Sequence, residues 1–492
     1  MVKTFTFQKT LILAFFVVIA FGTACKKNTA DSTQSVEQGT SGTRDELTKD
    51  SIYLYAQQTY FWNVGMPTYA AFNPRQYSSN NAVLSALKAL PSTGGKDKYS
   101  FIDEGSVATQ LGGTGGDYGF SANFYQDTLR VKYVYPSSPA TKVDLKRGYA
   151  IININGKAVS NTTTADLNSA IFGTNASISM TVEKPDKSRQ DVTIIRGTYT
   201  INPVLYTNTF TVGTKKVGYL VFNSFTTNAS TFLDAAFSKF ASDGVTELVV
   251  DLRYNGGGSV ATSENLTNLI APSSQNGKLM YTTYWTKTMQ DGLATILQNQ
   301  KFYAKGTDGV TRLYSYFDYS YKPTMAAGNV EYFAKKGSLN ALTRVYFLVS
   351  SGTASASELL INNLKPVMDV KLIGKTTYGK PVGFFGIHID KYDLYIPQFQ
   401  TRNQLDQGDY FSGMTVDKDI VDDLSKDFGD PAEKMLSQAL YYSANNVFLA
   451  NIKNNNILSS TSGSVSTKFS APVAELDHEF KGMVESRKLT LK

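Results

Sequence analysis

The chain of 492 residues is longer than one ordinary domain, and with 42% hydrophobic and only 18% charged residues it is globular rather than disordered. Its net charge of +7 is not gathered into a dense basic cluster, so nucleic-acid binding is not implied. With two histidines and one cysteine, a zinc site of histidine or thiolate ligands is nearly excluded, and we expect neither metal nor cofactor. A hydrolase built from this chain must find its general base elsewhere, and lysine is the natural candidate.

Residues 1–25 have the pattern of an export signal, because a basic start precedes an apolar run, Leu11 to Phe21, that is too short to span a bilayer comfortably. Small residues then precede a lone cysteine, which resembles the processing site of a bacterial lipoprotein. The resemblance implies lipidation of Cys25, a membrane anchor and a position facing the periplasm or the cell surface. Gly22 stands where the usual pattern has Leu, so ordinary secretion with an incidental Cys25 is the alternative.

The next segments change from polar to periodic. Residues 26–45 lack hydrophobic periodicity, which predicts a flexible tether. Apolar residues at helical spacing then begin at Leu47, and a second run, Ala82 to Leu90, is stopped by Pro91. We therefore predict a small helical N-terminal domain over residues 46–104, with aromatic residues that form its core rather than a binding site.

Residues 105–200 carry strand and turn signals. A Gly-Gly-Asp-Tyr-Gly-Phe run at 115–120 precedes an alternating strand at 129–135, and Asn155-Gly156 is a hairpin signal. The run resembles the carboxylate-binding loop of PDZ domains, and the resemblance assigns peptide binding to Tyr118, Gly119 and Phe120. Because PDZ domains bind a peptide as an added strand, the resemblance also implies that this domain binds the C-termini of substrates. The alternative is another small β-rich domain.

Residues 201–445 alternate strands with helices. The runs Val217–Phe222 and Leu248–Leu252 are strands on either side of a helix at 231–240, an order that predicts parallel pairing with right-handed crossovers. A Tyr-rich stretch, 271–340, is expected to be a β-rich insertion. The predicted fold is thus a multidomain α+β and α/β chain, with helical, PDZ-like and α/β core parts.

Two strand ends of this core carry residues suited to acyl chemistry. Asn255 and three glycines follow the strand at 248–252, and a small-residue turn that ends in Ser355 follows the strand at 345–349. Because Ser355 opens a helix, it lies where unpaired backbone N–H groups can stabilise an oxyanion. The alternative is that Ser355 is only the N-cap of a packed turn.

A lysine follows the next strand. Residues 370–374 lead into a Gly379-Lys380 turn. A helix that leads away from Ser355, followed by a strand that returns along it, would bring Lys380 near Ser355. A free lysine has a pKa of roughly 10.4, and burial lowers that value because it disfavours the charged form. We therefore expect a neutral Lys380 within hydrogen-bond reach of Ser355 Oγ, where it can act as general base.

These three motifs, in this order, resemble those of the carboxyl-terminal processing, or tail-specific, serine peptidases. The resemblance covers roughly residues 105 to 440 and implies that Ser355 is the nucleophile, Lys380 its base and Glu358 a carboxylate near the dyad. It also implies an oxyanion hole, whose donors would be the N–H groups of Ala356 and of Gly257 or Gly258. The implied function is a serine endopeptidase that hydrolyses exported or envelope proteins, with peptides or unfolded proteins as partners.

One position departs from that family. Phe384 stands where many relatives have a Gln that orients the lysine amine, which leaves the third catalytic member unassigned. The departure favours the alternative of a catalytically weak or inactive peptide-binding module on the same fold. A lipase or esterase would need Gly-x-Ser-x-Gly, which Thr353 and Ser357 do not supply. His388, which a Ser-His-Asp triad would have to use, is expected to face a strand rather than the nucleophile.

The end of the chain reads as a polar extension over residues 446–492, Asn/Ser-rich at 446–467. Of the apolar residues that follow, we expect Phe469, Phe480 and Met483 to dock weakly on the rest of the protein.

Overall fold

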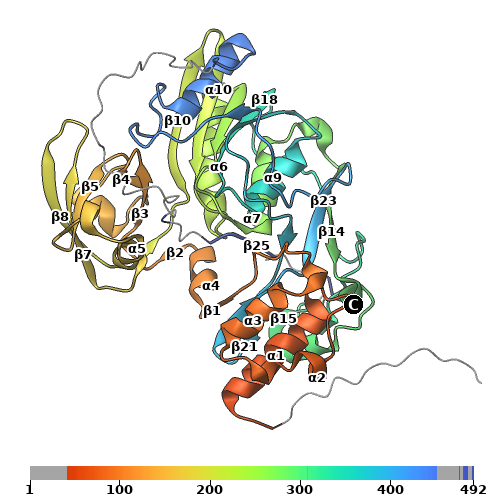
Figure 1. Ribbon diagram of the computed structural model, residues 1–492. Helices are drawn as coiled ribbons and strands as arrows, with labels where there is room; N and C mark the ends of the chain where they lie inside the picture. Colours follow the sequence, from red (N-terminus) through yellow and green to blue (C-terminus); the bar gives the residue numbers. More distant parts are fainter. Residues whose placement is uncertain (1–40, 307, 451–475, 477–479, 486–489, 492) are drawn as a thin grey trace, which may run out of the picture. The chain divides into compact units, whose positions relative to one another are not determined.

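The computed structural model describes residues 41–306, 308–450, 476, 480–485 and 490–491 (Figure 1). The export signal, Cys25, Phe469 and most of the tether therefore lie outside the described residues. Within the described ranges, no helix combines the length and the apolar character that a bilayer crossing requires.

Both predicted N-terminal helices are confirmed. They are α1 (Arg44–Thr59) and α3 (Asn80–Lys88), joined through α2 (Tyr69–Phe72). The first helix begins inside the segment predicted as tether, because Thr43 and Glu46 form a capping box that satisfies its first backbone donors. Tyr53 of α1 stacks on Phe72 of α2, with 4.9 Å between ring centroids, so these aromatic residues are core as expected.

A curved antiparallel sheet follows. Its strand order is β3-β4-β5-β7-β8, with a short β6 paired to β5. Val131, Ile178 and Val182 are fully buried between this sheet and α5 (Thr164–Phe172). The strands are β3 (Phe120–Tyr125), β4 (Thr128–Val134), β5 (Ala150–Ile154), β6 (Lys157–Ala158), β7 (Ser177–Glu183) and β8 (Arg189–Ile195).

The central sheet has the strand order β10-β11-β12-β18-β19-β24. Neighbours from β11 onward pair in parallel, as predicted, while β10 is antiparallel to β11. The strands are β10 (Val204–Val212), β11 (Lys215–Phe222), β12 (Glu247–Asp251), β18 (Arg344–Val349), β19 (Asp369–Gly374) and β24 (Lys418–Asp419). All five residues of β12 are buried, which explains why its apolar run is nearly continuous rather than alternating.

Helices cover both faces of this sheet (Figure 1). Met435 and Leu436 of α10 (Lys434–Asn445) pack on Tyr219 and Val249, which point to one face. Phe240 of α6 (Ala229–Ser242) lies beside Gly218, whose neighbours in the strand alternate to the opposite face. The remaining core helices, α7 (Val260–Ile270) and α9 (Ala356–Leu364), contact each other.

The predicted β-rich insertion at 271–340 contains β14 (Leu279–Trp285), β17 (Val330–Tyr332) and the hairpin β15–β16 (Lys301–Lys305, Thr311–Ser315). The insertion is joined to the rest of the chain, because β14 also pairs with β23 (Phe399–Asn403), which in turn pairs with β20 (Val382–Gly383). Its aromatic residues divide between core and surface: Tyr281 is fully buried, whereas Tyr303 is 77% exposed.

The weak docking expected for the end of the chain is wrong for residues 480–485. Residues Gly482–Val484 form β25, which pairs in parallel with β13 (Gly257–Ser259), and Met483 is fully buried. A three-residue strand that begins with glycine has no periodic signal of its own, so only the pairing partner reveals it.

Candidate active site

Ser355 lies in the turn between β18 and α9, where its backbone has φ +60° and ψ −108°. A positive φ is rare for a residue other than glycine and is found mainly where surrounding contacts enforce it. Here Thr353 Oγ1 donates to Leu252 O (2.8 Å) and Ala354 N to Asn255 O (3.2 Å). The side chain of Ser355 is fully buried, and its Oγ makes no hydrogen bond to any described residue.

Lys380 is also fully buried, in the turn that follows β19. Its Nζ donates to Lys481 O at 2.8 Å and lies 3.8 Å from the centroid of the Phe384 ring. Burial lowers the pKa of Lys380 well below its ordinary value, against the opposing charges of Asp97 and Glu358. The expected contact with Ser355 Oγ is not formed in this structure, because the amine is directed to Lys481 instead.

Glu358 holds these two residues in one place. Its Oε2 accepts hydrogen bonds from Ser355 N and Lys380 N, each at 2.8 Å. Its Oε1 accepts from Gly379 N at 2.7 Å and from Thr377 Oγ1. Burial raises the pKa of Glu358, and these four bonds oppose that effect. Since all four partners donate, we interpret the side chain as an ionised, purely accepting carboxylate.

The glycine motif lies against the serine turn. Asn255 Nδ2 donates to Phe222 O, and Asn255 Oδ1 accepts from Gly257 N, both at 2.9 Å. A Cβ atom on Gly257 would lie 3.0 Å from Ala356 N, so the candidate oxyanion donors are neighbours. Because Gly257 N already donates within its own loop and Gly258 pairs with Met483, both glycines are occupied in this structure.

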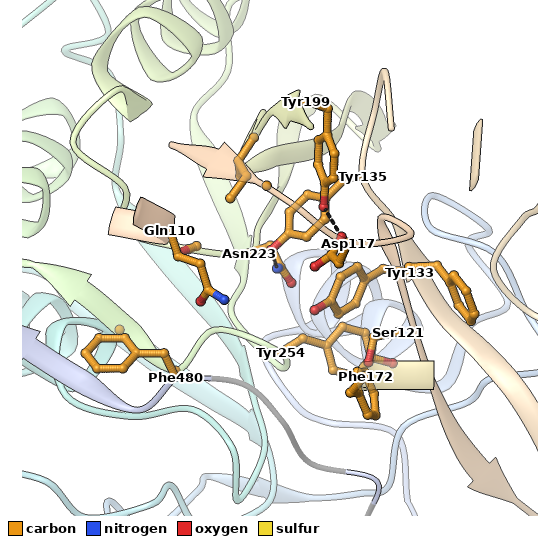
Figure 2. Close-up of a pocket in the computed structure, with 16 residues that line it drawn as sticks. Gln110, Asp117, Ser121, Tyr133, Tyr135, Phe172, Tyr199, Asn223, Tyr254 and Phe480 are labelled. Atoms are coloured by element: carbon orange, nitrogen blue, oxygen red, sulfur yellow. Dashed lines mark hydrogen bonds between the residues drawn. The ribbon is translucent and has the colours of Figure 1, made fainter. Parts of the chain in front are cut away.

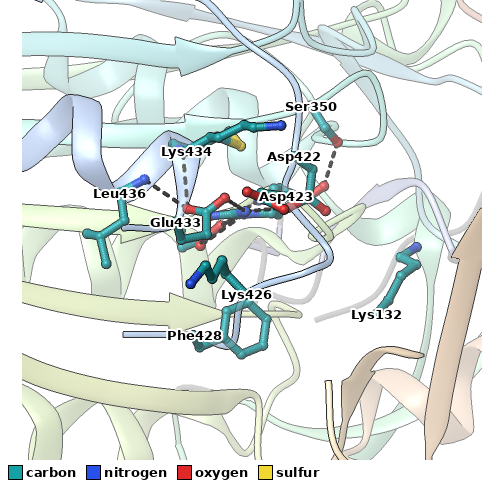
Figure 3. A network of polar contacts seen from close by, with 12 residues as sticks. Lys132, Ser350, Asp422, Asp423, Lys426, Phe428, Glu433, Lys434 and Leu436 are labelled. Carbon is teal, nitrogen blue, oxygen red and sulfur yellow. Dashed lines mark hydrogen bonds and ion pairs between the residues drawn. The ribbon is translucent and has the colours of Figure 1, made fainter. Parts of the chain in front are cut away.

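A buried ionic network, which the sequence did not predict, supports this loop. Arg253, fully buried, pairs with Asp251 (2.8 Å), Glu433 (2.9 Å) and Asp422 (2.5 Å). Arg147, which comes from the β4–β5 connection, also pairs with Asp422, at 2.9 Å. Figure 3 shows Asp422, Asp423 and Glu433 gathered at this point. Burial acts to raise the pKa of Asp422, but the two arginines outweigh it and lower that pKa.

The residues assigned to the PDZ-like loop have different surroundings. Tyr118 is buried and its hydroxyl donates to Asn175 O at 2.8 Å, while Gly119 has φ +82°. Phe120 lines a pocket that extends from the 115–121 loop to Gly256 and Gly257. Asp117 and Ser121 of this loop are labelled among the lining residues in Figure 2. Phe480 lines the same pocket, so its wall includes the loop, the glycine motif and the end of the chain.

His388 lies on β21 (Ile387–Ile389), as expected for a strand residue, and its side chain is 69% exposed. Its Nδ1 pairs with Asp393 Oδ1 at 3.0 Å. Because Ser355 Oγ makes no hydrogen bond to any described residue, this histidine is not bonded to the serine.

The lowered pKa of Lys380 predicts a pH dependence of stability. Between the folded and unfolded pKa values the unfolded chain binds the extra proton, so the free energy of unfolding should rise with pH, by up to about 1.4 kcal/mol per pH unit. Lys380→Met should remove that slope in urea titrations at pH values up to about 9.5. Lys335 is the matched control: burial lowers its pKa to about 8, so Lys335→Met should flatten the curve only above that value. Identical slopes for the parent and Lys380→Met would contradict a lowered pKa.

The four donors to Glu358 predict a strong effect of neutralisation. In Glu358→Gln one oxygen becomes an NH₂ group, which leaves two donors without an acceptor, each at a cost of about 1–3 kcal/mol. We expect a lower urea midpoint and, in any reaction that uses both Ser355 and Lys380, a lower turnover. Glu104→Gln is the control, because the Glu104 side chain is 66% exposed. A variant as stable as the parent would show that Glu358 does not join the two turns.

The chain is similar to known peptidases. Residues 216–420 match the family model of peptidase family S41. The chain is 25% identical over 257 residues to a chloroplastic C-terminal processing peptidase of Tetradesmus obliquus, covering 50% of this chain and 46% of the relative. It is 24% identical over 292 residues to a CtpA-like serine protease of Staphylococcus aureus, with coverage of 58% and 49%. The chain thus spans about half the length of these curated relatives.

A solved structure extends the likeness beyond the core. The structure of a candidate S41 protease from Bacteroides fragilis superposes with a TM-score of 0.58 at 26% identity, covering 81% of this chain and 97% of that one. The predicted α+β multidomain fold and the likeness to C-terminal processing peptidases are confirmed, and the match to the model of peptidase family S41 extends over residues 216–420.

Proposed function

We propose that the chain is a serine endopeptidase in which Ser355 is the nucleophile and Lys380 the general base. The observation that carries this proposal is the shared carboxylate: Glu358 Oε2 binds the backbone N–H of both residues at 2.8 Å. A lysine whose pKa is lowered by burial, held in the same buried site as a serine, has the properties that a Ser/Lys dyad requires.

In the proposed reaction, the neutral Lys380 amine takes the proton of Ser355 Oγ as the oxygen attacks a peptide carbonyl. The N–H of Ala356 and that of Gly257 or Gly258 stabilise the oxyanion, which requires the glycine concerned to leave its present partner first. Lys380 then returns the proton to the leaving amine, and water hydrolyses the acyl-enzyme. Since Lys380 Nζ now donates to Lys481 O, its side chain must turn to Ser355 Oγ before the first step.

For the remainder of the chain we propose a helical N-terminal domain at 46–104, a PDZ-like domain at 105–200 and a catalytic domain at 201–445. Tyr118, Gly119 and Phe120 belong to the proposed peptide-binding loop. Support comes from Leu476, an apolar residue near the end of the chain that packs into the buried cluster of Tyr118 and Phe120. We propose that this domain engages the C-termini of unfolded or envelope proteins.

A second function, peptide binding with little or no cleavage, is favoured by two observations. Phe384 provides an apolar ring beside Lys380 Nζ, and Ser355 Oγ has no partner among the described residues. Both functions use the same cleft, so measured turnover separates them.

Ser355→Ala and Lys380→Ala should each reduce cleavage of an unstructured protein by at least about 1,000-fold, because each removes one half of the dyad. Two variants serve as matched controls: Ser443→Ala removes another fully buried serine, and Lys335→Ala another lysine with a lowered pKa. Both controls should keep the parental rate, measured by fluorescence release from a labelled protein. Equal turnover in all five proteins would eliminate the dyad, and no turnover in any would favour the binding module.

We also propose that the chain is exported and anchored to a membrane through lipidated Cys25, the single cysteine of the sequence. One relative is a chloroplastic C-terminal processing peptidase, which is consistent with a place outside the cytosol. Cys25→Ser should therefore move the protein from the membrane fraction to the soluble fraction, because stable anchoring depends on the acyl chains. Ser35→Ala, in the polar segment that follows Cys25, should leave the distribution unchanged. A Cys25→Ser protein that stays in the membrane fraction would contradict lipidation.

A further inference from the structure

Residues 480–485 run through the proposed active site as an added strand. On one side β25 pairs with the glycine motif, Gly257 opposite Gly482, and Gly482 N donates to Gly256 O at 3.0 Å. On the other side Phe384 N donates to Met483 O at 3.0 Å, and Glu485 N donates to Phe384 O at 2.9 Å. An extended peptide with backbone bonds on both edges is the arrangement in which sheets capture peptide ligands.

The surface beneath this segment is shaped for a backbone. A Cβ atom on Gly256 would lie 2.0 Å from Phe480 O, and one on Gly257 would lie 2.3 Å from Gly482 O. Any side chain at either glycine would therefore collide with the segment. The glycines after Asn255 thus form a floor along which a peptide main chain lies in direct contact.

Two side chains of the segment pack into the cleft in the way that the side chains of a bound peptide would. Met483 is fully buried. Phe480 packs in a cluster with Phe384 and Phe101, at 6.4 Å and 6.0 Å between ring centroids. The cleft therefore receives an aromatic side chain and, three residues later, a flexible apolar one.

The segment also occupies the reactive groups. Lys380 Nζ donates to Lys481 O, and with the segment in place Ser355 and Lys380 are both fully buried. A nucleophile with no exposed surface cannot meet a substrate, and a base bound to a peptide carbonyl is not bound to the serine. The arrangement is that of a blocked site rather than of a peptide about to be cleaved.

Contacts on either side retain the segment. Before it, Leu476 is buried in the cluster of the antiparallel β3–β8 sheet. After it, Ser320 N donates to Thr490 O at 3.0 Å, and Leu491 forms a bridge with Tyr319. A ligand tethered to its own site has an effective concentration in the millimolar range, so it competes strongly even when its intrinsic affinity is modest.

From these contacts we infer that residues 480–485 are a built-in competitive inhibitor of the peptide cleft. The inference rests on the proposed function. It names the ligand class as extended peptides that carry an aromatic residue and an apolar residue three positions later. Substrates of this class act by displacing the segment from the glycine floor and from Phe384.

Substitution of the buried methionine tests this inference in the full chain. Met483→Asp places a charge in a fully buried position and should release the segment, raising kcat/KM for an unstructured peptide by about tenfold or more. Val447→Asp is the matched control, because Val447 is 57% exposed and its substitution should leave the rate unchanged. Gly482→Ala is a second variant of the segment, since its Cβ would lie 1.9 Å from the Phe480 ring and that ring would have to leave its place beside Phe384 and Phe101. Thermal melts identify any variant that fails to fold.

A binding assay separates this inference from the proposed catalysis. In a Ser355→Ala background, a fluorescent peptide with the sequence of residues 478–486 should bind Met483→Asp about tenfold or more tightly than the unreleased chain. Tighter binding without hydrolysis in any protein would support the inhibitor and reject the peptidase. Hydrolysis at equal rates in Met483→Asp, Gly482→Ala and the parent, with equal peptide affinity, would overturn the inhibitor and leave the peptidase intact.

Discussion

The geometry of the site depends on a single buried carboxylate. Ser355 enters from the turn after β18 and Lys380 from the turn after β19, so no local structure joins them. Glu358, one turn into α9, accepts hydrogen bonds from the backbone N–H of each, and it also accepts from the Gly379 N–H and the Thr377 hydroxyl. An unpaired carboxylate would be costly at this depth, and four donors offset that cost. The two turns are thereby fixed to each other through main chain rather than through the reactive side chains, which stay free to exchange partners.

The glycine floor needs a different support, because residues without side chains cannot pack. Arg253, which precedes the glycines, forms ion pairs with Asp251, Asp422 and Glu433. The side chain of Asn255 forms hydrogen bonds within the loop itself. Arg147 reaches Asp422 from another sheet and so connects the proposed PDZ-like domain to the same cluster. Supporting contacts of this kind fix the conformation of a loop, so that its main chain can contact a ligand directly.

Much of this could be predicted from the sequence, because its signals are local. The strands Val217–Phe222 and Leu248–Leu252 are apolar runs, and the turns at Ser355 and Lys380 follow such runs directly. The Arg253 network was not predictable, because two of its carboxylates, Asp422 and Glu433, lie far along the chain in segments without a distinctive pattern. The strand at Gly482 gave no signal either, since three residues that begin with glycine acquire strand character only by pairing with Gly257.

The proposed inhibitor bears on how the glycine floor would bind peptide substrates. Main-chain contacts of the kind made by Gly256 and Gly257 discriminate little between sequences, so such a cleft would accept many unfolded chains. Because residues 480–485 are tethered, a substrate would have to compete with their high effective concentration before it could reach Ser355. Peptides that first bind the proposed PDZ-like domain gain the same advantage of proximity. Under the proposed function, selectivity therefore arises from competition between two tethered peptides rather than from the side-chain pockets alone.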